Sequence, residues 1–151
     1  MKRNKIHRRD FIKTASALVG FPFIVSASAI GKAGKTPPSE KITMGFIGTG
    51  GQGTSNMKAF LYQKDSKVVA VCDVDRKRRK NAQKMVNDFY KNKDCADYNY
   101  FRKIIERPDI DTVATALPDH WHAIPAIVAA RAGKDIYGEK PLAYIIPEGR
   151  A

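Results

Sequence analysis

The chain has little of what small disulfide scaffolds and metal proteins depend on. Its 151 residues include only two cysteines, three histidines and one tryptophan. Cys72 lies in an apolar stretch and Cys95 in a polar one. Two such cysteines make neither a disulfide framework nor a zinc-ligand spacing. The length suits one domain with a real core. The sequence therefore argues against a disulfide scaffold, and we predict no metal site.

Long apolar runs are also missing. The longest weakly apolar stretch, 15–30, is interrupted by serine, glycine and proline, so it is too broken for a membrane span. It follows Arg8-Arg9-Asp10-Phe11-Ile12-Lys13, which resembles a twin-arginine export signal, and it ends near the small residues Ala27-Ser28-Ala29. We predict a signal peptide over 1–29, periplasmic delivery by the twin-arginine machinery without stable membrane insertion, and a linker over 30–41. A plain basic tail is the alternative.

Acidic residues are scarce, because 27 Lys and Arg face 15 Asp and Glu and leave a formal net charge of +12. Much of the excess lies in the first thirteen residues, and one dense run follows at Arg76-Lys77-Arg78-Arg79-Lys80. No zinc-ligand spacing and no aromatic RNA-binding motif accompanies these charges, so we predict no nucleic-acid binding. A solvated helix face is the simpler interpretation of the run.

Glycine is concentrated in one segment. The apolar run 42–47 leads into Gly48-Thr49-Gly50-Gly51-Gln52-Gly53, and a helical apolar pattern follows at Met57, Phe60 and Leu61. This order predicts a strand, a tight turn and a helix. Gly48 permits the turn, Gly50 leaves space for a pyrophosphate beside the backbone, and Gly53 lets the helix pack on the strand. We interpret all six turn residues as cofactor-binding, with phosphates at the helix N-terminus; a purely structural turn is the alternative.

The next apolar strand, 67–73, supports this interpretation. It ends in Asp73, twenty positions after Gly53. A carboxylate there can accept hydrogen bonds from the adenosine ribose hydroxyls and repel a 2′-phosphate, which favours NAD over NADP. Against this, the arginines of 76–79 lie close enough in sequence for one of them to meet a phosphate. We predict NAD as the cofactor, with NADP less favoured.

The remaining pattern alternates strands and helices, which predicts a doubly wound parallel α/β sheet of the Rossmann type over 42–151. A helix over 76–90 carries a predicted core stripe of Ala82, Met85, Val86 and Phe89. Further strands are predicted near 96–98, 112–117 and 135–137, with a brief helix before Pro108 and another that closes at Gly133.

Polar motifs follow the last two predicted strands. Pro118-Asp119-His120-Trp121-His122 comes after one, and Glu139-Lys140-Pro141 after the other. Ligands bind at the carboxyl ends of parallel strands. Pro125 requires the regular helix to begin near His122, which leaves His120 and Trp121 on a loop. We expect Pro118, His120, Trp121 and His122 to contact cofactor or substrate, and Lys140 to reach a nicotinamide or a substrate hydroxyl. The alternatives are a turn around a buried Trp121 and a surface lysine paired with Glu139.

Four motifs in this order resemble the Gfo/Idh/MocA oxidoreductases, the glucose-fructose oxidoreductase and inositol dehydrogenase family. They are 48–53, 71–75, 118–123 and 139–141. The resemblance implies an NAD(P)-binding Rossmann domain followed by a second α/β domain with a large open sheet, sugar or cyclitol substrates, and a homo-oligomer. It also implies that Glu139, Lys140 and Pro141 bind the cofactor, that Lys140 is the catalytic lysine, and that the peptide before Pro141 is often cis.

In the family, the other acid/base residues belong to the second domain, and this sequence stops before it. We therefore expect an N-terminal, truncated part of a longer enzyme that is inactive by itself. Three functions fit the sequence. The first is an exported NAD-dependent oxidoreductase of sugars, glycosides or cyclitols. The others are an NAD-dependent glycosidase that works by transient oxidation and elimination, and a non-catalytic nucleotide-binding module.

Overall fold

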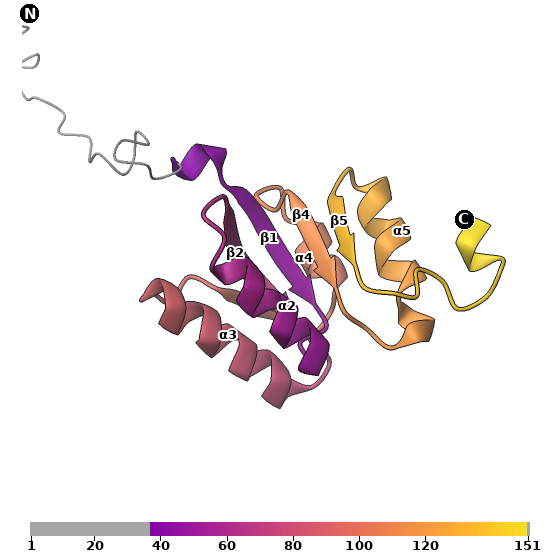
Figure 1. Ribbon diagram of the computed structural model, residues 1–151, viewed down its shortest axis with the longest axis horizontal. Helices are drawn as coiled ribbons and strands as arrows, with labels where there is room; N and C mark the ends of the chain where they lie inside the picture. The colour runs from indigo at the N-terminus through magenta and orange to yellow at the C-terminus, as the bar shows by residue number, and fades with distance from the viewer. Residues whose placement is uncertain (1–36, 151) are drawn as a thin grey trace, which may run out of the picture.

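The computed structural model describes residues 37–150, and the predicted signal peptide lies outside them. Five parallel strands form one sheet in the order β3-β2-β1-β4-β5 (Figure 1). The strands are β1 Ile42–Ile47, β2 Ser66–Cys72, β3 Ala96–Tyr98, β4 Thr112–Thr115 and β5 Asp135–Gly138. The helices are α2 Gly51–Leu61, α3 Arg76–Tyr90, α4 Arg102–Ile105 and α5 Ala123–Arg131, with 3-10 turns η2 Pro38–Glu40, η3 Asp119–Trp121 and η4 Glu148–Arg150. The predicted doubly wound α/β fold is confirmed.

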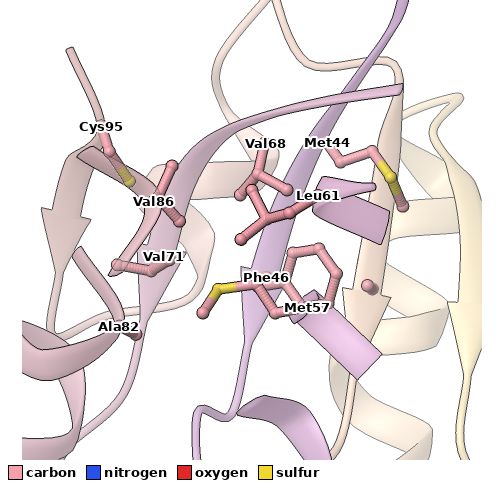
Figure 2. Packing of buried hydrophobic residues seen from close by; sticks show 10 residues of the cluster. Met44, Phe46, Met57, Leu61, Val68, Val71, Ala82, Val86 and Cys95 are labelled. Carbon is pink, nitrogen blue, oxygen red and sulfur yellow. The ribbon is translucent and has the colours of Figure 1, made fainter. Parts of the chain in front are cut away.

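Helices cover both faces of the sheet, and each face has its own apolar core. Against α2 and α3 the buried side chains are Met44, Phe46, Met57, Leu61, Val68, Val71, Ala82, Val86, Cys95 and Ala114 (Figure 2). Against α4 and α5 they are Ile47, Ala70, Cys72, Phe101, Ile104, Ile105, Ile110, Val113 and Ala129. Successive strand residues point to opposite faces, so Phe46 and Ile47 of β1 belong to different cores. The central strand is thereby held from both sides.

The sheet has its topological switch point between β1 and β4. From β1 the chain builds β2 and β3 on one side, and β4 and β5 lie on the other (Figure 1). β1 pairs with β4 in parallel, with Ile47 opposite Thr115. The carboxyl ends of these two strands are therefore neighbours, which brings the glycine turn beside the loop that carries His120 and Trp121.

The predicted core stripe of α3 was wrong at its last member. Ala82 and Val86 are buried, whereas Phe89 is 39% exposed. The Phe89 ring packs edge to face on Tyr62 and Tyr90, with ring centroids 5.1 and 5.2 Å away. Phe89 thus packs on neighbouring aromatic rings, whereas Tyr90 of the same turn packs against the core and accepts a hydrogen bond from the Val68 backbone N–H of β2 at 3.1 Å. The predicted bounds of α3 are confirmed, and Asp75 caps its start by accepting hydrogen bonds from the backbone N–H groups of Lys77 and Arg78.

No helix in the part of the chain from residue 37 to residue 150 combines the length and apolarity needed to cross a membrane.

Candidate dinucleotide-binding site

The glycine turn is closed at its ends and open in its middle. Gly48 has φ of +87°, and a Cβ on it would overlap the carbonyl oxygen of Ala116. A Cβ on Gly53 would overlap the carbonyl oxygen of Gly48. At Gly51 a Cβ would meet nothing within 4 Å, and at Gly50 only the Arg78 guanidinium, at 3.5 Å. The outer glycines therefore permit close packing, while the middle of the turn leaves space beside the backbone.

A cavity of about 530 Å³ lies against this open part of the turn. It is at the carboxyl ends of β1, β2 and β4, where parallel sheets bind ligands. Nine predicted site residues line it: Gly48, Gly50, Gly51, Gln52, Gly53, Asp73, Pro118, His120 and Trp121. Gly50 caps α2 without a side-chain hydrogen bond. The helix N-terminus therefore presents backbone N–H groups and its positive dipole end to the cavity, as a pyrophosphate requires.

Asp73 connects the end of β2 to the glycine turn. Its Oδ2 accepts hydrogen bonds from the Thr49 backbone N–H at 2.8 Å and from Thr49 Oγ1 at 3.1 Å. Its Oδ1 accepts one from the Asp75 backbone N–H at 2.9 Å. Thr49 is buried and does not line the cavity. Asp73 does line the cavity. Its hydrogen bonds to Thr49 hold the turn in shape, and its contact with ribose hydroxyls stays a prediction.

The loop after β4 divides its aromatic residues between the cavity and the protein interior. Trp121 is 45% exposed and lines the cavity with His120, which contradicts the alternative of a turn around a buried tryptophan. His122 is 3% exposed, and its Nε2 donates a hydrogen bond to the carbonyl oxygen of Leu117 at 2.6 Å. This bond gives the His122 ring a structural role in the loop. The predicted contact of His122 with cofactor or substrate remains untested.

Glu139, after β5, is bound to α2. Its Oε1 accepts hydrogen bonds from Asn56 Nδ2 at 2.6 Å and from Gln52 Nε2 at 3.2 Å, and these bonds lower the pKa of the Glu139 carboxyl. The carboxylate thus bonds to two amides, and none of the ion pairs among residues 37–150 joins it to Lys140. Lys140 is exposed, and the peptide before Pro141 is cis, as the resemblance implied.

The side chains of 139–141 do not line the cavity themselves. They are linked to it through Gln52, which both lines the cavity and hydrogen-bonds to Glu139. The roles of Glu139, Lys140 and Pro141 in cofactor binding, and of Lys140 in catalysis, stay predictions. Between residues 37 and 150, no three His, Cys, Asp or Glu side chains are grouped so that they could hold a metal ion.

Arg78 of α3, one of the arginines that the sequence offered for a phosphate contact, lines the cavity. The segment 99–102 between β3 and α4 also lines it and was not predicted. In that segment Arg102 lies over the Phe101 and Tyr100 rings, 4.6 and 5.3 Å from their centroids, and donates to the Tyr100 hydroxyl at 2.6 Å. A signal was available, because 99–102 directly follows the predicted strand 96–98. The rule of carboxyl ends applies to that strand as well.

The open glycine turn, the acidic end of β2 and the cavity at the switch point define a dinucleotide-binding Rossmann domain. The chain belongs to the Gfo/Idh/MocA family, whose sequence profile, described as an oxidoreductase family with an NAD-binding Rossmann fold, matches residues 42–150. The predictions of this family and of NAD as the cofactor are confirmed.

Individual relatives extend the comparison. The chain is 32% identical to an α-N-acetylgalactosaminidase of Shewanella oneidensis, an alignment that covers 96% of this chain and 36% of the relative. A family 109 glycosyl hydrolase of Shewanella sp. strain MR-4 is 30% identical over the same shares. The crystal structure of Lactobacillus casei myo-inositol dehydrogenase with NAD(H) and myo-inositol is 28% identical, with a TM-score of 0.65, over 73% of this chain and 31% of that one. The chain thus spans about a third of these proteins.

Proposed function

We propose that residues 42–151 are the nucleotide-binding half of an exported NAD-dependent oxidoreductase. The enzyme transfers hydride between nicotinamide and a hydroxyl-bearing carbon of a sugar, glycoside or cyclitol. The observation that carries this proposal is the glycine turn, whose open middle faces a cavity at the switch point of the sheet. Membership of an NAD-binding oxidoreductase family and similarity to an inositol dehydrogenase support it.

In this proposal the chain's own residues have separate tasks. The N-terminus of α2, beside Gly50 and Gly51, binds the pyrophosphate, and Asp73 orients the adenosine ribose. NAD, when bound, supplies the hydride acceptor. Lys140 hydrogen-bonds the reacting hydroxyl and favours its deprotonation, because an ammonium group stabilises the developing oxyanion. Glu139, bound to Asn56 and Gln52, holds the segment that carries Lys140 against α2.

A second candidate is an NAD-dependent glycosidase. It is favoured by the 32% identity to an α-N-acetylgalactosaminidase, which extends over 96% of this chain. Oxidation of one sugar hydroxyl to a ketone acidifies the neighbouring C–H bond, which allows elimination of the glycosidic oxygen. Addition of water and return of the hydride then complete a net hydrolysis. The residues of the cavity would serve both reactions in the same way, because both begin with removal of a hydride.

We also propose export by the twin-arginine route, a second α/β domain that binds the substrate, and a homo-oligomer in the complete protein. The proposals on export and assembly stand on the residues 8–13 and on the family resemblance.

Titration calorimetry of the 151-residue chain with NAD tests the nucleotide site. Wild type should bind NAD, and Gly50→Val should bind it at least about a hundredfold more weakly, because its side chain would enter the space beside the turn. Circular dichroism should show the same fold and a similar melting temperature for both, since the only protein atom within 4 Å of a Cβ at Gly50 is at the end of the flexible Arg78 side chain. Equal affinity of the two proteins for NAD would reject the site.

Product analysis with the longest protein encoded by the gene separates the two reactions. An oxidoreductase accumulates NADH when a sugar or inositol is added with NAD. A glycosidase instead releases a free sugar from an aryl α-N-acetylgalactosaminide without lasting NADH, and loses this activity when NAD is removed. A protein that binds NAD and does neither across a broad panel of sugars, inositols and glycosides would support a non-catalytic nucleotide-binding module.

A further inference from the structure

Arg78 is exposed to solvent and lies beside the glycine turn. It is the third residue of α3, and its side chain lines the same cavity as Gly50 and Asp73. Its Nη1 is 3.5 Å from the position that a Cβ on Gly50 would take. Among the dense basic run 76–80, only Arg78 lines this cavity. The Arg78 guanidinium is therefore beside the part of the turn that leaves space for a pyrophosphate.

Two neighbouring cations of the run, Arg79 and Lys80, already have partners. Arg79 donates from Nε to Asp97 Oδ2 at 2.9 Å and from Nη1 to the carbonyl oxygen of Asp73 at 2.7 Å. Lys80 binds the other oxygen of Asp97 at 2.8 Å. Within residues 37–150, the Arg78 side chain is in none of the ion pairs, which join other residues. Its guanidinium thus forms no direct ion pair with a carboxylate in the described part of the chain.

Asp73, the acid that shares the cavity with Arg78, is hydrogen-bonded to other residues. Asp73 accepts hydrogen bonds from Thr49 and from the Asp75 backbone on its two oxygens. Arg102, the other arginine of the lining, donates to the Tyr100 hydroxyl and stacks on the adjacent rings. Arg78 is consequently the guanidinium best placed to meet a ligand beside the glycine turn. A planar guanidinium can donate two parallel hydrogen bonds to phosphate oxygens, which a helix N-terminus does not offer.

We propose that Arg78 is a cofactor-binding residue whose guanidinium pairs with the phosphate oxygens of the dinucleotide beside Gly50. The inference rests on the proposed NAD binding and deepens it. The pyrophosphate then has two kinds of partner: the backbone N–H groups of α2, which add only a partial positive charge, and the full charge of Arg78. Arg78 also lies in the same cavity as Asp73 at the adenosine end, so it contributes more to NADP, which carries a further phosphate on that ribose.

Titration calorimetry of the 151-residue chain with NAD, ADP and NADP tests this role in Arg78→Gln. The matched control is Arg76→Gln, which removes the same charge from the same helix at an exposed position outside the cavity. Arg78→Gln should weaken the binding of NAD and ADP about tenfold or more, and that of NADP further. The affinities of Arg76→Gln should stay within about twofold of those of wild type. Arg78→Lys should restore part of the loss, because it keeps the charge but not the fork. The difference in NAD affinity between wild type and Arg78→Gln should decrease at high salt, because salt screens the charge of Arg78.

Adenosine separates a phosphate contact from a base contact. Its binding, measured by ligand-detected NMR, should be the same in wild type and Arg78→Gln, and an equal loss of adenosine and ADP would overturn the phosphate assignment. The inference also fails if wild type binds NAD and Arg78→Gln binds it within about twofold, or if Arg76→Gln loses as much. If wild type binds no NAD at all, the proposed function fails instead. Melting curves followed by circular dichroism show that each variant is folded.

Discussion

Asp73 and Thr49 are joined by two hydrogen bonds to a single carboxylate oxygen, one from the Thr49 backbone N–H and one from its hydroxyl. The bonds link the end of β2 to the turn after β1, 24 residues apart in the sequence. The acid that the sequence marks as a ribose ligand therefore also holds the glycine turn. Changes at Asp73 should affect both the predicted ribose contact and the shape of the turn.

Replacement of Asp73 separates the two roles. Asp73→Ser removes the repulsion of a 2′-phosphate and the acceptor for Thr49, so NAD affinity should fall about tenfold while NADP affinity falls less. Asp73→Asn keeps an acceptor oxygen, so it should also narrow the preference for NAD over NADP, with a smaller loss of NAD affinity. Calorimetric titration of each protein with NAD and NADP measures the ratio of the two dissociation constants. A wild type that already prefers NADP would contradict the assignment.

The glycines of the turn should differ sharply in what they tolerate. A Cβ on Gly53 would overlap the carbonyl oxygen of Gly48, so Gly53→Ala should destabilise the fold by roughly 2 kcal/mol or more. Gly51→Ala is the matched control, since its Cβ meets nothing within 4 Å, and its stability should stay within about 0.5 kcal/mol of wild type. Urea unfolding measures both free energies. Similar losses in the two variants would show that close packing does not explain Gly53.

Asp97 should contribute stability that acid removes. Hydrogen bonds from Lys80 and then Arg79 lower the pKa of its carboxyl. The folded state therefore holds this proton less readily than the unfolded state, and the stabilisation is present at neutral pH and lost as pH falls through the depressed pKa. Asp97→Asn should lower stability by about 1 kcal/mol at pH 7 and progressively less in acid. Urea unfolding between neutral and acidic pH measures it. Asp88→Asn, whose ion pair with Lys84 is exposed, should change little.

Lys140 is the residue to test for catalysis in the complete protein. Lys140→Met should lower turnover by roughly a hundredfold or more, because the reacting hydroxyl loses its ammonium partner. NAD affinity should change by less than about twofold, since the phosphate and ribose partners lie at the glycine turn and Asp73. Steady-state kinetics and NAD titration give the two values. Turnover within about threefold of wild type would reject the catalytic role.

The proposed export depends on residues outside the described part of the chain. Replacement of Arg8 and Arg9 by lysines keeps the charge but should stop delivery to the periplasm, because the receptor requires the planar arginine group. Cell fractionation followed by immunoblotting measures the distribution. Unchanged delivery to the periplasm would contradict the twin-arginine signal and would leave the basic N-terminal residues without this role. Replacement of Lys2 and Arg3 by glutamine, which lowers the charge but keeps the arginine pair, serves as the control.

The amino-acid sequence by itself determined the local elements and the class of the site. The apolar run, the spaced glycines and the acid after the second strand predicted β1, the turn, α2 and β2, because strand and helix periods and glycine's freedom are properties of neighbouring residues. Pro125 placed the start of the helix after the loop that carries His120, because proline is tolerated only in the first turn of a regular helix. The cis peptide before Pro141 followed from the family resemblance.

Only the tertiary structure decided which side chains meet in the cavity. Arg78 and Arg79 are adjacent and chemically identical, yet one faces the glycine turn and the other binds Asp97 on β3. The segment 99–102 reaches the cavity because β3 lies beside β2, and Glu139 reaches Gln52 and Asn56 because β5 lies beyond β4. These contacts depend on strand order and on the direction of single side chains. Both are set by packing between residues far apart in the chain, which no local pattern records.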